Sequence, residues 1–307
     1  MFSLRLNSIK KGIIRCSSSW NRKSNSKMTV KKLADKKKNN DKITMLTAYD
    51  FTSAYYINNS HIDIALVGDS LGMTIQGHSD TLKVTMDNMI YHSEIVSRTC
   101  QNPLIITDLP AGSYEESKKD AVNNSFDLIK KGGVDAVKIE GGKDRKNVIE
   151  SVIKAGIPVM GHIGLQPQSI KQLGSFAAQG RDYESAKNIY YDALVLQDIG
   201  CFALVVECIP SLLAQKISQN LNIPVIGIGS GSHCDGQVLV YHDLLGMLPI
   251  VPNFAKKYCN SYNIIEDSIN EFREDVKENT FKCRKEIDFS SKEDKYKFLN
   301  LINEIQR

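Results

Sequence analysis

The sequence has no Cys-x-x-Cys pair and no apolar run long enough to cross a membrane. It also lacks a long Gly-, Ser- or Pro-rich linker, so its 307 residues suit one large α/β domain or two smaller ones. An odd number of scattered cysteines indicates reduced thiols and argues against a disulfide framework or structural zinc. Because no apolar run is long enough to cross a membrane, we also expect no membrane partner. The seven cysteines are Cys16, Cys100, Cys201, Cys208, Cys234, Cys259 and Cys283.

Acidic residues are absent from residues 1–34, which hold nine Lys or Arg side chains. The remainder holds 30 basic and 35 acidic residues, so the body is mildly acidic although the whole chain carries +4. Nucleic-acid-binding domains usually carry a basic face, and we expect no nucleic-acid partner. The basic, Ser-rich start lacks the apolar core of a secretory signal, which favours a mitochondrial transit peptide. A disordered tail on a cytoplasmic protein is the alternative.

Eight short apolar runs follow, and most end in a polar or glycine-rich step. Continuous apolar runs suit parallel strands that are covered on both faces. The intervening segments have helical spacing and often stop at Gly or Asn, as at residues 114–131, 147–155, 185–199 and 212–221. Thr85 is placed to cap a further helix from Met86 to about Thr99. The runs are ITMLTAYD, IALVGDS, PLIITDLP, AVKIEGG, IPVMGHIG, ALVVECIP, IPVIGIGSG and VLVYHDLLG.

Eight β–α units in roughly 250 residues are the expected size of a (β/α)8 TIM barrel, a single α/β domain. An open doubly wound sheet would carry a Rossmann fingerprint early, and the glycine-rich GIGSGSHCDG lies late and lacks its paired acid. We predict a barrel over residues 35–260, preceded by the N-terminal segment 1–34. A charged, amphipathic helical tail over residues 261–307 would pack on the barrel or on a second subunit.

Acidic side chains follow three consecutive predicted strands: Asp69, Asp108 and Glu140. The carboxyl ends of parallel barrel strands meet at one face, so these carboxylates can converge. Hard oxygen ligands without nearby Cys or paired His favour Mg²⁺ over zinc. A single acid would more readily be a helix cap or a solvated turn residue, but three successive strand ends predict a metal site.

Lys138 and Glu140 lie two residues apart and share one strand face, so both point into the barrel. Buried charges must be paired, which indicates function or else a salt bridge in the barrel floor. Glu207 follows apolar neighbours and could act as a base or cap the helix after Pro210. His162 lies between glycines, which allows close approach of a ligand but equally fits a structural histidine.

These stretches, in this order, resemble the ketopantoate hydroxymethyltransferase family. The similarity covers roughly Ile43 to Tyr258. The segments VGDSLGM, KIEGG and GHIGLQPQS are the most specific. The other matching motifs are TAYD, TIQGHSDTLKVT, YHSEIV, DLP, QGRD, ECIP, IPVIGIGSG and DGQVLVYHDLLG.

The resemblance implies a (β/α)8 enzyme of pantothenate, and hence coenzyme A, biosynthesis. Its reaction transfers a hydroxymethyl group from 5,10-methylenetetrahydrofolate to 3-methyl-2-oxobutanoate, giving 2-dehydropantoate through a Mg-stabilised enolate. Its partners would be the 2-oxo acid, the folate and further copies of the chain, because the family forms homodecamers. The resemblance assigns Asp69, Asp108 and Glu140 to Mg²⁺. It assigns Asp69, Ser70, Asp108 and Lys138 to the oxo acid, Glu207 to proton abstraction, and Lys138 and His162 to the catalytic group.

Ala111 stands where family members usually carry a bulky residue, and Ser230 where Ala is usual. Residues 290–307 look like an extension. One competing hypothesis is a Mg²⁺-dependent carbon–carbon lyase of the phosphoenolpyruvate mutase type, which would need a reactive thiol near a strand end, such as Cys208 or Cys234. A non-enzymatic scaffold is the other, and the presence of every acid argues against it.

Overall fold

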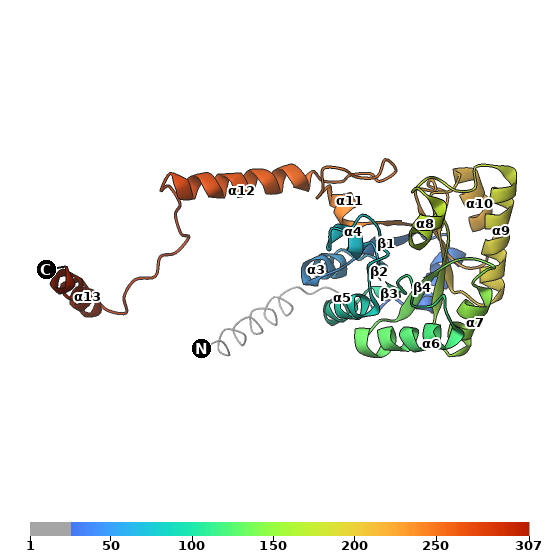
Figure 1. Ribbon diagram of the computed structural model, residues 1–307, viewed down its shortest axis with the longest axis horizontal. Helices are drawn as coiled ribbons and strands as arrows, with labels where there is room; N and C mark the ends of the chain where they lie inside the picture. Colours follow the sequence, from blue (N-terminus) through green and yellow to red (C-terminus); the bar gives the residue numbers. More distant parts are fainter. Residues whose placement is uncertain (1–25, 307) are drawn as a thin grey trace. The chain divides into compact units, whose positions relative to one another are not determined.

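Eight parallel strands close into a barrel, in which each strand pairs with its sequence neighbours and β8 pairs with β1. The structure is a computed structural model that describes residues 26–306 (Figure 1). It confirms the predicted (β/α)8 architecture and the positions of seven strands. The eighth apolar run was placed too late, because β8 ends at Leu239 and most of that run forms a helix. The strands are β1 (Ile43–Thr47), β2 (Ile64–Val67), β3 (Leu104–Asp108), β4 (Ala136–Glu140), β5 (Val159–Gly164), β6 (Ala203–Glu207), β7 (Val225–Ile228) and β8 (Gly236–Leu239).

Helices surround the barrel and connect its strands. Thr85 caps α5 as expected, because its hydroxyl accepts from the Asn88 amide while the Asn88 side chain accepts from the Thr85 amide. The helix expected from Tyr114 begins only at Lys118, because Ser117 is its cap. The helices are α3 (Phe51–Asn59), α4 (Leu71–Thr74), α5 (Met86–Thr99), α6 (Lys118–Asp127), the π-helical turn η1 (Leu128–Gly132), α7 (Lys146–Lys154), the 3₁₀ turn η2 (Pro167–Ser169), α8 (Ile170–Leu173), α9 (Tyr183–Asp198), α10 (Ser211–Asn220) and α11 (Tyr241–Leu245).

Side-chain alternation divides the apolar residues into two cores. In β4, Val137 and Ile139 pack outward against the helices, and Lys138 and Glu140 point into the barrel, as the sequence predicted. The barrel interior is apolar in its lower layers, filled by Ile43, Met45, Ile64, Leu66, Leu104, Ile106, Ala136, Met160, Ala203, Val205, Ile226 and Val238. Above these layers the inward side chains become polar and charged.

A short helix, α2 (Val30–Lys38), covers the amino-terminal mouth of the barrel. Its Leu33 is fully buried against the first inward residues of the strands. Thr29 caps the helix, and Lys37 pairs with Asp235, which directly precedes β8, at 2.6 Å. The barrel unit therefore begins before residue 35, and this corrects the expected boundary at 34/35. The transit-peptide prediction falls largely on residues 1–25, outside the described residues.

Replacing Leu33 by Ala is expected to lower the free energy of unfolding by about 2–4 kcal/mol, because it leaves a cavity at the barrel floor. Urea unfolding of the full chain measures this. Lys31→Ala, on the exposed face of the same helix, is the control and should change little. An equal effect of the two substitutions would show that α2 does not support the barrel.

Residues 260–306 form a second compact unit, described here by itself. It holds α12 (Ser261–Lys277) and α13 (Lys292–Ile305), separated by an irregular segment. Apolar side chains along one side of α12, including Ile265, Ile269 and Phe272, are exposed. None of the helices in residues 26–306 combines the length and apolar character needed to span a membrane.

Candidate active site

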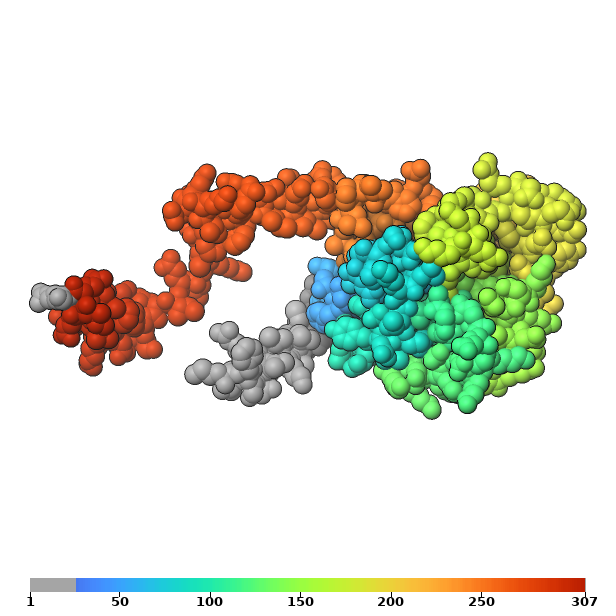
Figure 2. Space-filling model, viewed as in Figure 1, coloured from blue at the N-terminus to red at the C-terminus, as the bar shows by residue number. Residues whose placement is uncertain are grey.

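The polar side chains predicted from five strand ends meet inside the carboxyl end of the barrel. Loops after β2 and β5 adjoin over this end, where Lys171 Nζ lies 3.0 Å from Asp80 Oδ2 (Figure 2). Apart from Glu207, whose side chain is 15% exposed, these residues are almost fully buried. The group comprises Asp69, Asp108, Lys138, Glu140, His162 and Glu207.

Two basic side chains hold the acids together. Lys138 Nζ lies 2.9 Å from Asp108 Oδ1 and 3.3 Å from His162 Nδ1. His162 Nδ1 lies 3.3 Å from Glu140 Oε1, and its Nε2 lies 3.1 Å from Glu207 Oε2. His162 thus links the carboxylate of β4 to that of β6. These contacts place Lys138 and His162 between the acids at the carboxyl end of the barrel.

The carboxylates keep both cations charged. Burial lowers the pKa of His162, and Lys138 adds to this effect, but Glu140 and Glu207 outweigh both and raise the pKa to about 9. Burial likewise lowers the pKa of Lys138, but Asp108, Glu140 and Asp69 outweigh it and raise the pKa above its usual value. Both shifts favour the protonated forms of the two side chains.

The acids still carry more charge than these cations balance. Burial and the neighbouring charges of Asp108 and Glu140 raise the pKa of Asp69 well above its usual value. The backbone amide of Asp69 donates to Asp108 Oδ2 at 3.1 Å, so the ends of β2 and β3 lie side by side. A cluster with surplus buried negative charge is an environment that stabilises a cation.

The oxygen donors suit Mg²⁺, although the side chains are not gathered around one point. In residues 26–306 no three His, Cys, Asp or Glu side chains converge as a ready-made metal cage. Asp108 Oδ1 is buried and has no aligned hydrogen bond in the described chain, its contact with Lys138 being an ion pair only. Mg²⁺ commonly binds through one or two carboxylates and completes its shell with waters and substrate oxygens, so the donor set fits this ion.

Sequence reasoning missed Gln168 and Tyr114. Gln168 Nε2 donates to Asp69 Oδ2 at 2.8 Å and to the Leu109 carbonyl at 2.9 Å, while its backbone amide donates to Glu140 Oε2 at 3.1 Å. The buried Tyr114 hydroxyl donates to Gln168 Oε1 at 2.6 Å. A signal existed for Gln168, which lies in the motif GHIGLQPQS, in the short turn that follows β5. Nothing in the sequence around Tyr114 distinguishes it from a helical residue.

Gly164 brings β5 close to Glu207. It adopts φ +93°, and a Cβ at this position would overlap the Glu207 carbonyl oxygen. The next amide, that of Leu165, donates to the same carbonyl at 2.8 Å. Only glycine therefore permits this approach, which fixes the backbone of Glu207 beside the end of β5.

Ser70 directly follows the buried Asp69 in the sequence. Its Oγ is 2.7 Å from the Tyr49 hydroxyl, at the start of α4. Ser230, one of the departures from the family pattern, is buried, and its hydroxyl donates to the Val206 carbonyl at 2.9 Å, tying the loop after β7 to β6. Ala111 is partly exposed in the loop after β3.

The thiols do not favour the lyase hypothesis. Cys208 follows Glu207 and is buried in a left-handed conformation with φ +48°. Burial, with a further contribution from Glu207, raises the pKa of the Cys208 thiol to about 12. Burial also raises the pKa of Cys234, to about 11. Neither thiol is set up to ionise near neutral pH, as a nucleophile requires.

His242 and Asp243, which close the eighth apolar run, lie in α11. The ring centroid of His242 lies 5.6 Å from that of Tyr49. Burial raises the pKa of Asp243 to about 6. The ionised carboxylate is therefore disfavoured in the folded state.

Asp243→Asn is expected to stabilise the protein above pH 6 and not at pH 4. A carboxyl whose pKa is raised by folding adds stability below its unfolded pKa and loses it as the pH rises through the folded value. The side chain is partly solvated, so screening reduces the effect to about 1 kcal/mol. Thermal unfolding of both forms at pH 4 and pH 7.5 measures it, and an identical gain at both pH values would contradict this origin.

A model of the family described as ketopantoate hydroxymethyltransferase matches residues 27–283. The chain belongs to this family. It is 45% identical over 256 residues to the 3-methyl-2-oxobutanoate hydroxymethyltransferase of Syntrophomonas wolfei, covering 83% of this chain and 93% of that protein. It is 48% identical over 255 residues to the protein of the same name from Saccharolobus solfataricus, covering 83% and 95%. These matches confirm the resemblance inferred from the motifs.

Solved structures with the same fold have distant sequences. Oxaloacetate acetylhydrolase aligns with a TM-score of 0.56 at 12% identity, covering 80% of this chain and 87% of that one. The 2,3-dimethylmalate lyase, a PEP mutase/isocitrate lyase superfamily member, aligns with a TM-score of 0.55 at 14% identity, covering 84% and 88%. At such identities the likeness concerns the barrel alone and carries no conclusion about chemistry.

Proposed function

We propose that this chain is a 3-methyl-2-oxobutanoate hydroxymethyltransferase, which performs the first step of pantothenate biosynthesis. The reaction consumes 3-methyl-2-oxobutanoate, 5,10-methylenetetrahydrofolate and water, and yields 2-dehydropantoate and tetrahydrofolate. The relatives of the same name, 45% and 48% identical over most of both chains, support it. The observation that carries the proposal is the buried group of acids and bases at the carboxyl end of the barrel.

Glu207 is the group we assign to remove the proton from C3 of the oxo acid. Its carboxylate is partly exposed, and His162 Nε2 lies 3.1 Å from Oε2, which fixes the direction of the carboxylate. Water adds to the folate-borne methylene carbon and both of its bonds to nitrogen break, which releases tetrahydrofolate. The electron pair left on C3 forms the new bond to that carbon, and the oxygen from water becomes the hydroxyl, taking the proton that Glu207 removed.

Lys138 and Ser70 are the groups we assign to bind the oxo acid. The Lys138 ammonium is charged and buried between Asp108 and His162, where it can balance negative charge that develops on the substrate. The Ser70 hydroxyl opens α4 and can orient the substrate carboxylate. Asp69 and Asp108 complete the substrate contacts.

We assign Mg²⁺ to Asp69, Asp108 and Glu140. When bound, this ion polarises the keto oxygen and lowers the energy of negative charge next to C3. The surplus of buried carboxylates supports this assignment. Gln168 donates hydrogen bonds to Asp69 and Glu140. Its hydrogen bond to Asp69 would have to shift when an ion binds to that carboxylate.

The test is product formation by the full chain with both substrates, with Mg²⁺ or with EDTA. Metal-dependent appearance of 2-dehydropantoate is the expected result. Exchange of the C3 hydrogen in D₂O, followed by NMR without folate, reports proton removal alone. Exchange without product would point to another one-carbon donor, whereas the absence of both would remove the proposed function.

Glu140→Gln is expected to lose Mg²⁺-dependent turnover while the protein stays folded. The amide is a weak ligand for a hard cation, and the substitution keeps the volume of the buried side chain. Turnover against Mg²⁺ concentration and circular dichroism measure the two parts. Turnover like that of the wild type at low Mg²⁺ would remove Glu140 from the metal site.

We also propose a mitochondrial location, with a cytoplasmic one as the alternative, and a homodecamer. The basic, Ser-rich segment before the barrel supports the first. The exposed apolar side of α12 is consistent with burial against another subunit. A fluorescent fusion carrying residues 1–28, and light scattering of the purified chain, test the two statements.

A further inference from the structure

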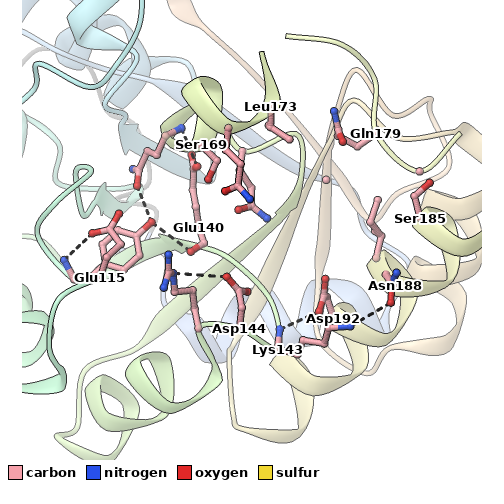
Figure 3. Close-up of a pocket in the computed structure, with 18 residues that line it drawn as sticks. Glu115, Glu140, Lys143, Asp144, Ser169, Leu173, Gln179, Ser185, Asn188 and Asp192 are labelled. Atoms are coloured by element: carbon pink, nitrogen blue, oxygen red, sulfur yellow. Dashed lines mark hydrogen bonds and ion pairs between the residues drawn. The ribbon is translucent and has the colours of Figure 1, made fainter. Parts of the chain in front are cut away.

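Two side chains that the proposed reaction does not use, Tyr114 and Gln168, connect the acids of the site to the loops around it. Both line a polar cavity beside the acids, together with Glu140 (Figure 3). Tyr114 belongs to the loop after β3, and Gln168 belongs to the 3₁₀ turn η2 after β5. Their hydroxyl and amide groups meet at 2.6 Å, although the two residues are 54 positions apart in the sequence.

The hydrogen bonds fix the direction of the Gln168 amide. Nε2 lies 2.9 Å from the Leu109 carbonyl, which can only accept, so the nitrogen and not the oxygen of the amide must face it. The other N–H of the amide donates to Asp69 Oδ2 at 2.8 Å. Both donors are then in use, and Oε1 accepts from the Tyr114 hydroxyl.

Gln168 contacts two of the three acids that we assign to the ion. Its side chain donates to Asp69, and its backbone amide donates to Glu140 Oε2 at 3.1 Å. Both donors are neutral, so they hold the carboxylates without adding a charge that competes with a cation. The hydrogen bond to Asp69 uses Oδ2, and a carboxylate can accept a hydrogen bond on one oxygen while it binds an ion through the other.

The loop after β3 holds Tyr114 in one place. Glu115 Oε2 accepts from the backbone amides of Gly112 and Tyr114, at 2.9 and 3.2 Å. Asn124, from α6, donates to the Ser113 carbonyl at 2.6 Å and ties the loop to the helix that follows it. The Tyr114 side chain is buried, with 2% of the residue exposed. Its hydroxyl is therefore a fixed anchor for the Gln168 amide.

We propose that Tyr114 and Gln168 are positioning residues of the metal site: the Tyr114 hydroxyl fixes the Gln168 amide, and the amide orients Asp69 for the ion. The inference rests on the proposed function, because it takes Asp69 and Glu140 as metal ligands. Neither positioning residue contacts the ion or the reacting atoms. Hydrogen-bonding partners of metal ligands fix the orientation of those ligands, and the loss of one weakens metal binding by about 10- to 100-fold.

Tyr114→Phe tests the anchor, because it removes the hydroxyl and keeps the ring. It is expected to raise the Kd for Mg²⁺ about tenfold or more, measured by calorimetric titration of Mg²⁺ into the full chain without substrates. The Mg²⁺ concentration for half-maximal turnover should rise by the same factor. Because the metal ligands themselves remain, saturating Mg²⁺ should restore kcat to that of the wild type.

Gln168→Met tests whether the hydroxyl acts through the amide. The substitution keeps the length of the side chain, removes its hydrogen bonds and is expected to weaken Mg²⁺ binding at least as much as Tyr114→Phe. Adding Tyr114→Phe to it should cause no further loss, because the hydroxyl then has no amide to hold. Tyr190→Phe is the matched control. It removes a hydroxyl that accepts from the Asn220 amide at 2.9 Å, between α9 and α10, and should leave the Kd for Mg²⁺ unchanged.

Wild-type affinity for Mg²⁺ in a Tyr114→Phe protein, shown to be folded by circular dichroism, would overturn the positioning role. Additive losses in the double variant would also overturn it, since the two residues would then act separately. A loss of kcat that saturating Mg²⁺ does not restore would place Tyr114 in the chemistry instead. A wild-type chain that binds no Mg²⁺ would overturn the metal assignment and this proposal together. The expected Mg²⁺ affinities without any product would overturn the proposed function and leave the positioning pair standing.

Discussion

Glu207→Gln is expected to lower kcat by about a thousandfold, within the range that general bases contribute. The amide cannot accept the C3 proton, but it keeps the size of the side chain and a contact with His162 Nε2. The exchange of the C3 hydrogen in D₂O should fall in parallel, because it depends on the same proton transfer. KM for the oxo acid should change little.

The control for Glu207→Gln is Glu184→Gln, at an exposed position in the first turn of α9. It should retain full exchange and turnover. A Glu207→Gln protein that exchanges the C3 hydrogen at the wild-type rate would assign the base to another group. If turnover alone were lost, Glu207 would act after proton removal, in the step that forms the new carbon–carbon bond.

Lys138→Met is expected to lower the free energy of unfolding by about 3–5 kcal/mol at pH 7, because it leaves buried carboxylates without their cation. Turnover should be lost as well, since Lys138 supplies the only ammonium that pairs with Asp108 in residues 26–306. Adding Asp108→Asn to this variant should recover part of the stability, as the remaining partner is then neutral. Urea unfolding of the two single variants and the double variant measures the coupling.

Lys154→Met is the control for Lys138→Met. Its ammonium pairs with Glu150 on the exposed side of α7, where solvent screens the interaction. Its stability should match that of the wild type. If Lys138→Met were as stable as this control, the acids of the site would be balanced by something other than the lysine.

Much of the site was predictable because buried parallel strands have continuously apolar sequences, and the carboxyl ends of barrel strands all lie at one face. Asp69, Asp108 and Glu140 each end or follow such a run, so their placement at one end of the barrel followed from the fold. The face shared by Lys138 and Glu140 followed from strand alternation. The link from Glu140 through His162 to Glu207 did not follow, because it depends on side-chain rotamers and on the register between β4, β5 and β6.

Other features depend on contacts that are distant in sequence. Tyr114 has the spacing of a helical residue, yet Ser117 begins the helix after it and the ring turns to Gln168. Leu33 follows a basic, Ser-rich segment that has the composition of a targeting peptide. Only the open end of the barrel, formed by residues from Ile43 onward, gives this leucine a place to be buried.

The helix that covers the barrel floor also makes the barrel sensitive to proteolysis at one place. Thr29 caps α2, and Lys27 pairs with Asp135 just before it. A cut beyond this point would expose the apolar ends of the strands to water. A closed barrel floor therefore requires an intact α2, and limited proteolysis within this helix should lower the stability of the barrel.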